Sequence, residues 1–153
     1  MLIPSPVLVI CAGNLCRSPF AEGYMRKRFE AAGAPVEVFS RGLLALPNQR
    51  PPLEAQEAAR AFGVDLSGHV AQPLLGGDLD RAGLVLVMSP DQRKHLARMK
   101  PAAIGKVFLL SQPADGAPVP DPMGRDAAFF EQVYADIAAL VDAWLTRFGV
   151  AAA

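Results

Sequence analysis

The stretch Val7–Gly23, VLVICAGNLCRSPFAEG, decides the fold of this chain. It opens with Val7–Ile10, a continuous apolar run rich in β-branched residues, which predicts a strand buried on both faces. A short polar loop follows. Ser18 and Pro19 then predict a helix start, with Ser18 as the N-cap and Pro19 at the first helical position. A buried strand that passes through a tight loop into a helix is typical of an α/β fold.

The remaining sequence continues this alternation of strands and helices. Short apolar runs predict three further strands, at Val36–Phe39, Leu84–Met88 and Lys106–Leu110. Apolar residues at helical spacing predict helices from Ser18 to Gly33, over Leu53–Phe62 and Pro90–Met99, and from about Arg125 to Phe148. We therefore expect a single domain over residues 1–153, with a four-stranded parallel sheet flanked by helices on both faces. Such sheets bind ligands beyond the carboxyl ends of their strands, which points to the loop after the first strand.

Composition excludes several classes of partner. The 15 basic and 15 acidic side chains of the 153-residue chain cancel, so no overall field attracts nucleic acid or an acidic membrane surface. The first residues lack the basic segment of an export signal, and no apolar stretch approaches the roughly 18 residues of a membrane span. Two cysteines without an export signal indicate thiols in a reducing compartment. We expect a monomeric, cytoplasmic protein with neither nucleic acid nor membrane as partner.

The loop from Cys11 to Arg17 has the chemistry of an anion site. Backbone N–H groups of a short loop that enters a helix form a cradle for oxyanions, and the helix dipole strengthens it. Gly13 and Asn14 tolerate the left-handed conformations that such a loop needs, and Arg17 can grip two phosphoryl oxygens. A cysteine at the base of the cradle should be populated as thiolate, so we expect Cys11 to attack phosphorus and form a phosphocysteine. The residues expected around the phosphate are Ala12, Gly13, Asn14, Leu15, Cys16 and Ser18.

Three other interpretations of the two cysteines are weaker. Four residues separate Cys11 from Cys16, which is not the spacing of a thioredoxin-type redox pair, although the two could form a protective disulfide under oxidation. Zinc requires more ligands than two cysteines and two distant histidines supply, so neither a metal nor another cofactor is expected. A nucleotide-binding loop is excluded because no Gly-Lys-Ser/Thr follows.

The proposed chemistry also needs a carboxyl group. A leaving oxygen departs faster when protonated, and water that attacks a phosphocysteine needs a base; one carboxyl can do both in turn, for roughly 10²–10⁴-fold in rate. Asp121 suits this role because Pro122 holds it extended in the proline-rich stretch Pro113–Pro122. From the residues alone, an Asx-Pro turn before the last helix explains Asp121 equally well.

The segment Cys11-Ala-Gly-Asn-Leu-Cys-Arg17-Ser18-Pro19 resembles the signature Cys-x5-Arg-Ser of the low-molecular-weight protein tyrosine phosphatases. The resemblance extends over nearly the whole chain and includes Ser40-Arg-Gly42, Asp65-Leu-Ser-Gly-His69 and Asp121-Pro122. It implies an enzyme that hydrolyses phosphotyrosine in proteins through a phosphocysteine. It also implies a phosphotyrosine-containing protein as partner and, if the source is bacterial, a tyrosine kinase of polysaccharide export.

The resemblance assigns roles to single residues. It makes Cys11 the nucleophile, Arg17 the phosphate clamp and Asp121 the general acid. Supporting roles fall to the other matching positions: the hydroxyl of Ser18 stabilises the thiolate, Asn14 pins the loop with the help of Ser40 and His69, and Cys16 is the second, non-essential cysteine.

The chain departs from the family pattern at the walls of the expected pocket. Aliphatic Leu46 and Met123 stand where members often have aromatic residues, so stacking on a substrate ring should be weaker. Arg41 replaces a small residue, and we expect it to add a positive charge near the substrate entrance. His95 is expected on an exposed helix face, without a function.

Three alternatives are weighed against a tyrosine phosphatase. Thiol-coupled arsenate reductases of this fold need further cysteines, which this chain lacks. Protein arginine phosphatases carry a threonine before the second cysteine, where this chain has Leu15. A non-catalytic phosphate- or phosphopeptide-binding module would need neither nucleophile nor acid, whereas Cys11 and Asp121 are both present.

Overall fold

The computed structural model describes residues 3–150, and its centre is a parallel sheet. The strands are β1 (Val7–Cys11), β2 (Val38–Gly42), β3 (Leu84–Val87) and β4 (Val107–Leu109). They lie in the order β2-β1-β3-β4, and each neighbouring pair is parallel. The predicted fold class is therefore confirmed.

Side chains of β1 alternate between two apolar cores, one on each face of the sheet. Val7, Val9 and Cys11 belong to the core on one face, and Leu8 and Ile10 belong to the core on the other. All five are buried, as expected for a central strand covered on both faces. The alternation places the Cys11 side chain on the face of the first core.

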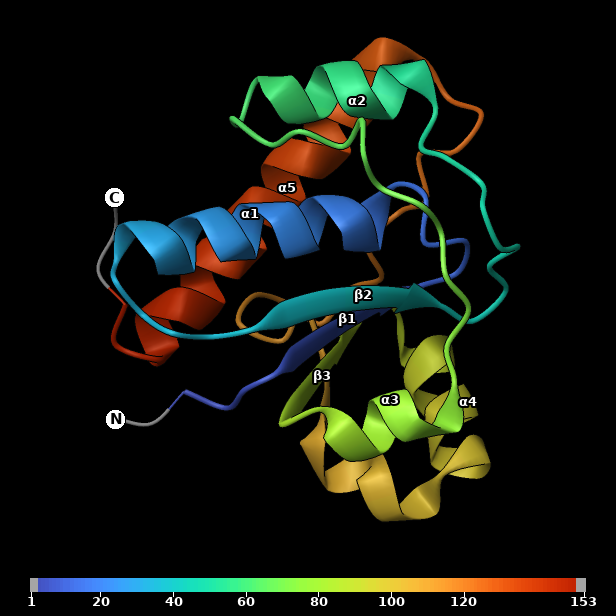
Figure 1. Cartoon of the computed structure of the whole chain (residues 1–153), viewed down its shortest axis with the longest axis vertical. Coiled ribbons are helices and arrows are strands. Elements are labelled where there is room, and N and C mark those ends of the chain that lie inside the picture. Colours follow the sequence, from blue (N-terminus) through green and yellow to red (C-terminus); the bar gives the residue numbers. More distant parts are fainter. Residues whose placement is uncertain (1–2, 151–153) are drawn as a thin grey trace.

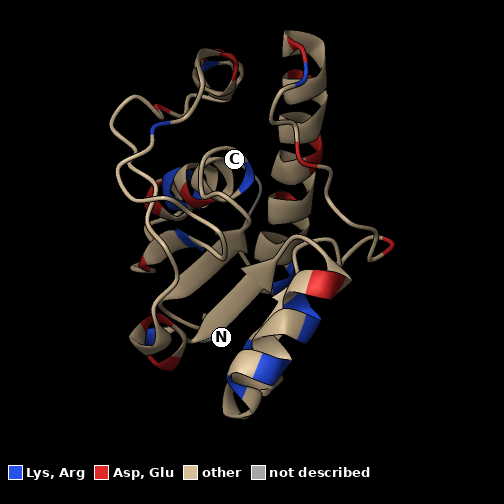
Figure 2. Cartoon of the chain, turned by 90° about the vertical axis from the view of Figure 1, so that its right-hand side faces the viewer, with Lys and Arg blue, Asp and Glu red and all other residues tan. Residues whose placement is uncertain are grey.

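Helices cover both faces of the sheet (Figure 1). On the face of the first core lie α1 (Arg17–Ala31) and α5 (Ala127–Arg147), with α2 (Leu53–Arg60) packed on α5 farther from the sheet. On the opposite face lie α3 (Gly76–Arg81), α4 (Pro90–Met99) and the short 3-10 helix η1 (Pro101–Lys106). Basic residues recur along α4 (Figure 2), whose first turn carries the acidic Asp91. Among residues 3–150, no helix is long and apolar enough to cross a membrane.

The start of α1 differs from the prediction. Cys16 is the N-cap and Arg17 the first helical residue, so Ser18 and Pro19 are the second and third. The hydroxyl of Ser18 does not cap the helix because it is engaged with the Cys11 sulfur, 2.9 Å away. Pro19 is tolerated in the first turn because its missing N–H has no partner there in any helix.

The end of β2 lies against the loop that follows β1. Leu43 N–H donates to the carbonyl of Cys11 (3.0 Å), and Leu44 N–H donates to that of Ala12 (2.8 Å). A Cβ atom at Gly42 would lie 2.7 Å from the Ala12 carbonyl oxygen and 3.0 Å from Asn14 Cβ. Only glycine permits this approach. The contacts hold the first residues of the loop, which follows β1, against the end of β2.

Candidate active site

Cys11 lies at the end of β1 beneath the loop, 2% exposed. Its Sγ is 2.9 Å from Ser18 Oγ and 3.4 Å from Ser18 N, which donates to it. Ser18 Oγ accepts a hydrogen bond from Asn14 Nδ2 (2.9 Å), so the hydroxyl hydrogen can be donated to Cys11 Sγ. Two donors from Ser18 then stabilise a negative charge on this sulfur.

Asn14 holds the loop in shape. Its φ of 53° is left-handed, and the residue is fully buried. The side-chain amide donates to Ser18 Oγ and to Ser40 Oγ, each at 2.9 Å, while its oxygen accepts from Gln72 N at 3.0 Å. The Asn14 carbonyl oxygen lies 2.8 Å from His69 Nε2, which must carry the hydrogen because a carbonyl only accepts. The sequence prediction that Ser40 and His69 lie next to Asn14 therefore agrees with their placement.

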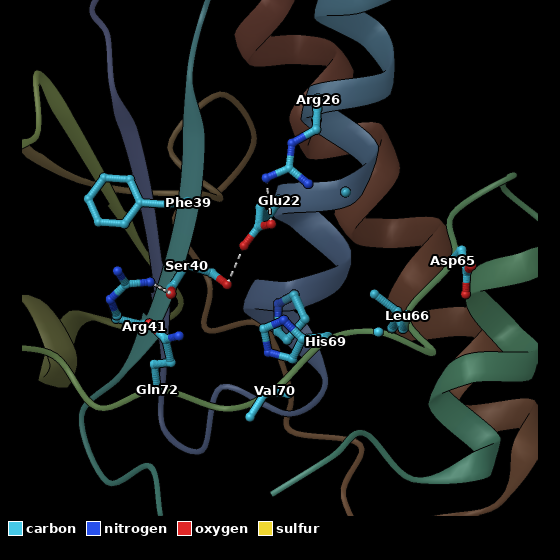
Figure 3. A pocket seen from close by; sticks show the side chains of 13 residues that line it. Glu22, Arg26, Phe39, Ser40, Arg41, Asp65, Leu66, His69, Val70 and Gln72 are labelled. Carbon is cyan, nitrogen blue, oxygen red and sulfur yellow. Dashed lines mark hydrogen bonds and ion pairs between the residues drawn. The ribbon is translucent and has the colours of Figure 1, made fainter. Parts of the chain in front are cut away.

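Glu22 extends this hydrogen-bonded chain to a cavity behind the loop. Ser40 Oγ donates to a Glu22 carboxylate oxygen at 2.6 Å, and Glu22 pairs with Arg26 at 2.7 Å. The cavity has a volume of about 490 Å³, and Glu22, Ser40 and His69 line it (Figure 3). Sequence reasoning missed Glu22, although its spacing of four residues from Ser18 on α1 was a usable signal. It also missed Gln72, which acts through its backbone and has no signal in its side chain.

Arg41 lines the cavity behind the loop. It pairs with Asp78 at 3.2 Å, donates to the Ser40 carbonyl at 2.8 Å and lies over the ring of Phe39 (Figure 3). It does not line the cavity at Cys11, so the prediction of an added positive charge at the substrate entrance is wrong. The reason is the ion pair with Asp78, which holds the Arg41 guanidinium away from the cavity at Cys11.

Arg17 connects the loop to the segment that carries Asp121. It is 6% exposed, and its guanidinium donates to the Val119 carbonyl at 2.9 Å. The Arg17 guanidinium lies 3.6 Å from a carboxylate oxygen of Asp121, whose side chain is 52% exposed. Val119 N–H in turn donates to the carbonyl of Met88 at the end of β3, at 2.9 Å. These contacts bring Asp121 to the mouth of the loop although it is more than a hundred residues away in sequence.

A cavity of about 240 Å³ opens above Cys11. Most of the residues predicted for the site line this cavity. Its lining consists of Cys11, Ala12, Gly13, Leu15, Cys16, Arg17, Leu44, Asp121 and Met123. Leu46 was expected in its wall but lies outside the lining, and Leu44 takes that place. The hydrogen bond from Leu44 N–H to the Ala12 carbonyl fixes residue 44, two residues earlier than expected, at the rim.

Cys16 differs from Cys11 in its surroundings. Burial, with smaller contributions from the charges of Asp121 and Cys11, raises the pKa of the Cys16 thiol to about 12. The hydroxyl of Tyr134, on α5, donates to the Cys16 carbonyl at 2.9 Å, and burial raises the pKa of this tyrosine as well. Cys16 is therefore a neutral thiol in the wall of the site, and both cysteines are free.

Comparisons with known proteins find relatives of similar sequence and fold. A profile of the low molecular weight phosphotyrosine protein phosphatase family matches residues 6–151. The chain is 35% identical over 138 residues to the low molecular weight protein-tyrosine-phosphatase Ptp of Acinetobacter johnsonii, covering 90% of this chain and 94% of that protein. It is similar to the tyrosine phosphatase Wzb of Escherichia coli in complex with sulphate, with a TM-score of 0.86 and 29% identity over 94% of this chain and 97% of that one. A YwlE arginine phosphatase mutant with a phosphorylated active site serine has a TM-score of 0.88 and 28% identity, over 94% and 95% of the two chains.

Proposed function

Since the chain belongs to the low molecular weight phosphotyrosine protein phosphatase family, we propose that Cys11, Arg17 and Asp121 hydrolyse phosphotyrosine in proteins through a phosphocysteine. The observation that carries this assignment is the cavity that these three residues share. Within it, the Cys11 sulfur receives hydrogen bonds from Ser18, and Arg17 lies beside a carboxylate that is open to solvent.

In the first step, the Cys11 thiolate attacks phosphorus, and the bond from phosphorus to the tyrosyl oxygen breaks. Asp121, protonated at this stage, gives its proton to the departing oxygen. The loop N–H groups and Arg17 hold the phosphoryl oxygens. Arg17 has donors to spare, because one of its N–H groups satisfies the Val119 carbonyl and four others remain.

In the second step, water attacks the phosphocysteine, and the bond between sulfur and phosphorus breaks. Asp121, now a carboxylate, takes the proton from the water, and phosphate and the Cys11 thiolate are released. The two hydrogen bonds from Ser18 stabilise the thiolate as it leaves. The same contacts therefore favour both the attacking and the leaving forms of the sulfur.

The cavity walls support phosphotyrosine as substrate in preference to phosphoarginine. Leu15, Leu44 and Met123 offer apolar contact to an aromatic ring. Among the described residues that line the cavity, Asp121 is the sole carboxylate, which leaves little to neutralise a guanidinium.

The proposed partner is a phosphotyrosine-containing protein, and a bacterial tyrosine kinase fits this description. The proposal includes a monomer in the reducing cytoplasm, because one chain supplies every site residue and the nucleophile is a thiol.

Rapid-mix hydrolysis of p-nitrophenyl phosphate in the presence of a chelator tests the assignment. We expect a burst of nitrophenolate from the wild type, no burst from Cys11→Ser, and slower turnover from Asp121→Asn. Phosphotyrosine and phosphoarginine peptides of the same sequence then decide the substrate. Absence of turnover in pure, reduced protein would overturn the proposal and favour a phosphate-binding module.

A further inference from the structure

A second cavity lies beside the catalytic one. Its volume is about 250 Å³, and its lining is Ala12, Leu43, Leu44, Asp91, Gln92 and His95. Ala12 and Leu44 also line the catalytic cavity, whose volume is about 240 Å³. Two cavities of nearly equal size therefore meet at Ala12 and Leu44, and Leu44 is 79% exposed. We call the second cavity the side groove.

Both walls of the side groove are fixed before any substrate binds. On one side, the N–H groups of Leu43 and Leu44 donate to the carbonyls of Cys11 and Ala12. On the other side, the Ser89 hydroxyl caps α4 by accepting from Gln92 N at 3.2 Å. A binding surface that is already ordered loses little conformational entropy when a ligand binds.

The lining of the side groove is apolar on one side and polar on the other. Leu43 and Leu44 supply apolar surface at the side shared with the catalytic cavity. Asp91 and His95 stand four residues apart on α4, so they lie on the same helix face, across from the leucines. The Asp91 carboxylate repels an acidic side chain, whereas the leucines favour an apolar one.

We propose that the side groove binds an apolar side chain of the protein substrate that lies within two residues of its phosphotyrosine. This inference rests on the proposed function, because the phosphotyrosine ring must occupy the catalytic cavity. In an extended peptide, side chains two residues apart lie on the same face, about 7 Å from each other, which suits two adjoining cavities. The side groove thus makes Leu44 and His95 determinants of substrate choice.

Matched phosphotyrosine peptides test this inference. Leucine, alanine or aspartate is placed in turn at each of the two positions on either side of the phosphotyrosine. Dissociation constants are measured with Cys11→Ser, because this variant binds the peptides without hydrolysing them. Values of kcat/KM are measured with the wild type. At one position we expect leucine to exceed alanine about tenfold in both measurements and aspartate to be the weakest.

Two variants assign the preference to the side groove. His95→Asp places a second carboxylate in the wall of the side groove and should reduce the leucine preference at least threefold. The peptide rates of each variant are divided by its own rate on p-nitrophenyl phosphate. Met99→Asp also adds a carboxylate to α4, outside the groove, and should leave the preference intact. Equal binding of all peptides, or equal effects of the two variants, would overturn the inference. Failure to hydrolyse p-nitrophenyl phosphate would instead contradict the proposed function. The ratios of the dissociation constants would then still show whether the side groove prefers an apolar side chain.

Discussion

Asn14 shows how much of the site depends on one side chain. Its amide contacts Ser18, Ser40 and the backbone of Gln72, while its backbone takes a left-handed conformation. Asparagine tolerates that conformation better than most residues, and its short amide reaches neighbours on both sides of the loop. One residue therefore sets the loop shape and orients the hydroxyl that faces Cys11.

Replacement of Asn14 should lower both stability and activity. We expect Asn14→Ala to lose about 1–3 kcal/mol for each well-buried partner left unsatisfied, and roughly 1–2 kcal/mol more for an alanine at positive φ. Asn14→Gly removes the same hydrogen bonds without the backbone strain, so it should be the more stable variant. Urea unfolding measures stability, and kcat on p-nitrophenyl phosphate measures the site. Wild-type kcat in both variants would contradict a positioning role for the amide.

The two cysteines should react very differently. Both cysteines are buried, so the difference lies in how each sulfur is surrounded. Burial raises the pKa of the Cys16 thiol to about 12, so it is protonated near neutral pH, whereas Cys11 Sγ has two hydrogen-bond donors from Ser18 that stabilise a thiolate. Iodoacetamide should therefore modify Cys11 in the folded protein and spare Cys16 until urea is added. Peptide mass spectrometry reads the two sites separately, and inorganic phosphate should protect Cys11. Equal labelling of both residues in the folded protein would refute this difference.

At the scale of elements, α5 supports the catalytic loop from behind. Tyr134 is fully buried, its ring stacks on Phe20 at 4.1 Å, and its hydroxyl donates to the Cys16 carbonyl. Cys16 is the N-cap of α1, so this hydrogen bond ties the last helix to the start of the first. The position of the loop is thereby coupled to the packing of two helices.

Tyr134→Phe isolates that coupling, because the ring contacts remain and only the hydroxyl is lost. We expect a loss of about 1 kcal/mol in the free energy of unfolding, measured in urea. Phe20 supplies the neighbouring control: Phe20→Leu disrupts the packing without touching the hydrogen bond and should cost more stability. A Tyr134→Phe protein as stable as the wild type would show that the hydroxyl contributes nothing.

The sequence could predict the elements that carry a strong local pattern. The strands β1 and β3 and the helix α4 follow from apolar runs and from Pro90, and α4 has the predicted bounds. The pattern could not find α3, because Gly76-Gly77 at its start is typical of a turn, or η1, which is a single irregular segment. The strand β2 begins at Val38 and not at Val36, because its limits are set by its pairing with β1.

The site could be predicted as far as its chemistry is local. The position of the loop between a buried strand and a helix indicated Cys11, Arg17 and the anion cradle. Asp121 needed the family resemblance as well, because the residues alone were equally consistent with an Asx-Pro turn. The rim could be predicted only in part: Met123 lines the cavity as expected, but Leu44 and not Leu46 enters its wall, because the Leu44 N–H donates to the carbonyl of Ala12, which is far away in sequence. Arg41 was misplaced for a related reason: its partner Asp78 is far away in sequence.

At the scale of the whole molecule, weakly acidic side chains with raised pKa values make the fold sensitive to alkali. Burial raises the pKa values of Cys16, Tyr24 and Tyr134 above their ordinary values of 9.0 for cysteine and 10.0 for tyrosine. Tyr24 also donates to Asp142, which holds its proton further. These protons are bound more tightly in the folded protein, so the unfolded chain releases them first as the pH rises. Their contribution to stability is complete below pH 9 and is lost as the pH rises toward 12 and beyond.

The free energy of unfolding should therefore fall steeply across this range. The Cys16 thiol alone accounts for a loss of about 4 kcal/mol in the free energy of unfolding, because its pKa is 9.0 in the unfolded chain and about 12 in the folded protein. Urea unfolding at intervals from neutral pH to pH 12 measures the slope, and Cys16→Ala, which has no thiol to ionise, should show a shallower one. Identical slopes for the wild type and Cys16→Ala would contradict the assignment to Cys16.

The close approach at Gly42 has a consequence for how such an enzyme changes over time. A side chain at Gly42 would meet the Ala12 carbonyl oxygen, Ala45 Cβ and Asn14 Cβ, so a substitution there requires the catalytic loop to move at the same time. Leu44 and Met123 project outward from this frame and can be exchanged singly. Substrate preference can therefore drift through point mutations at the rim while the chemistry at Cys11 is inherited intact. For the same reason, the rim is the place to start when redesigning the enzyme for other phosphate monoesters.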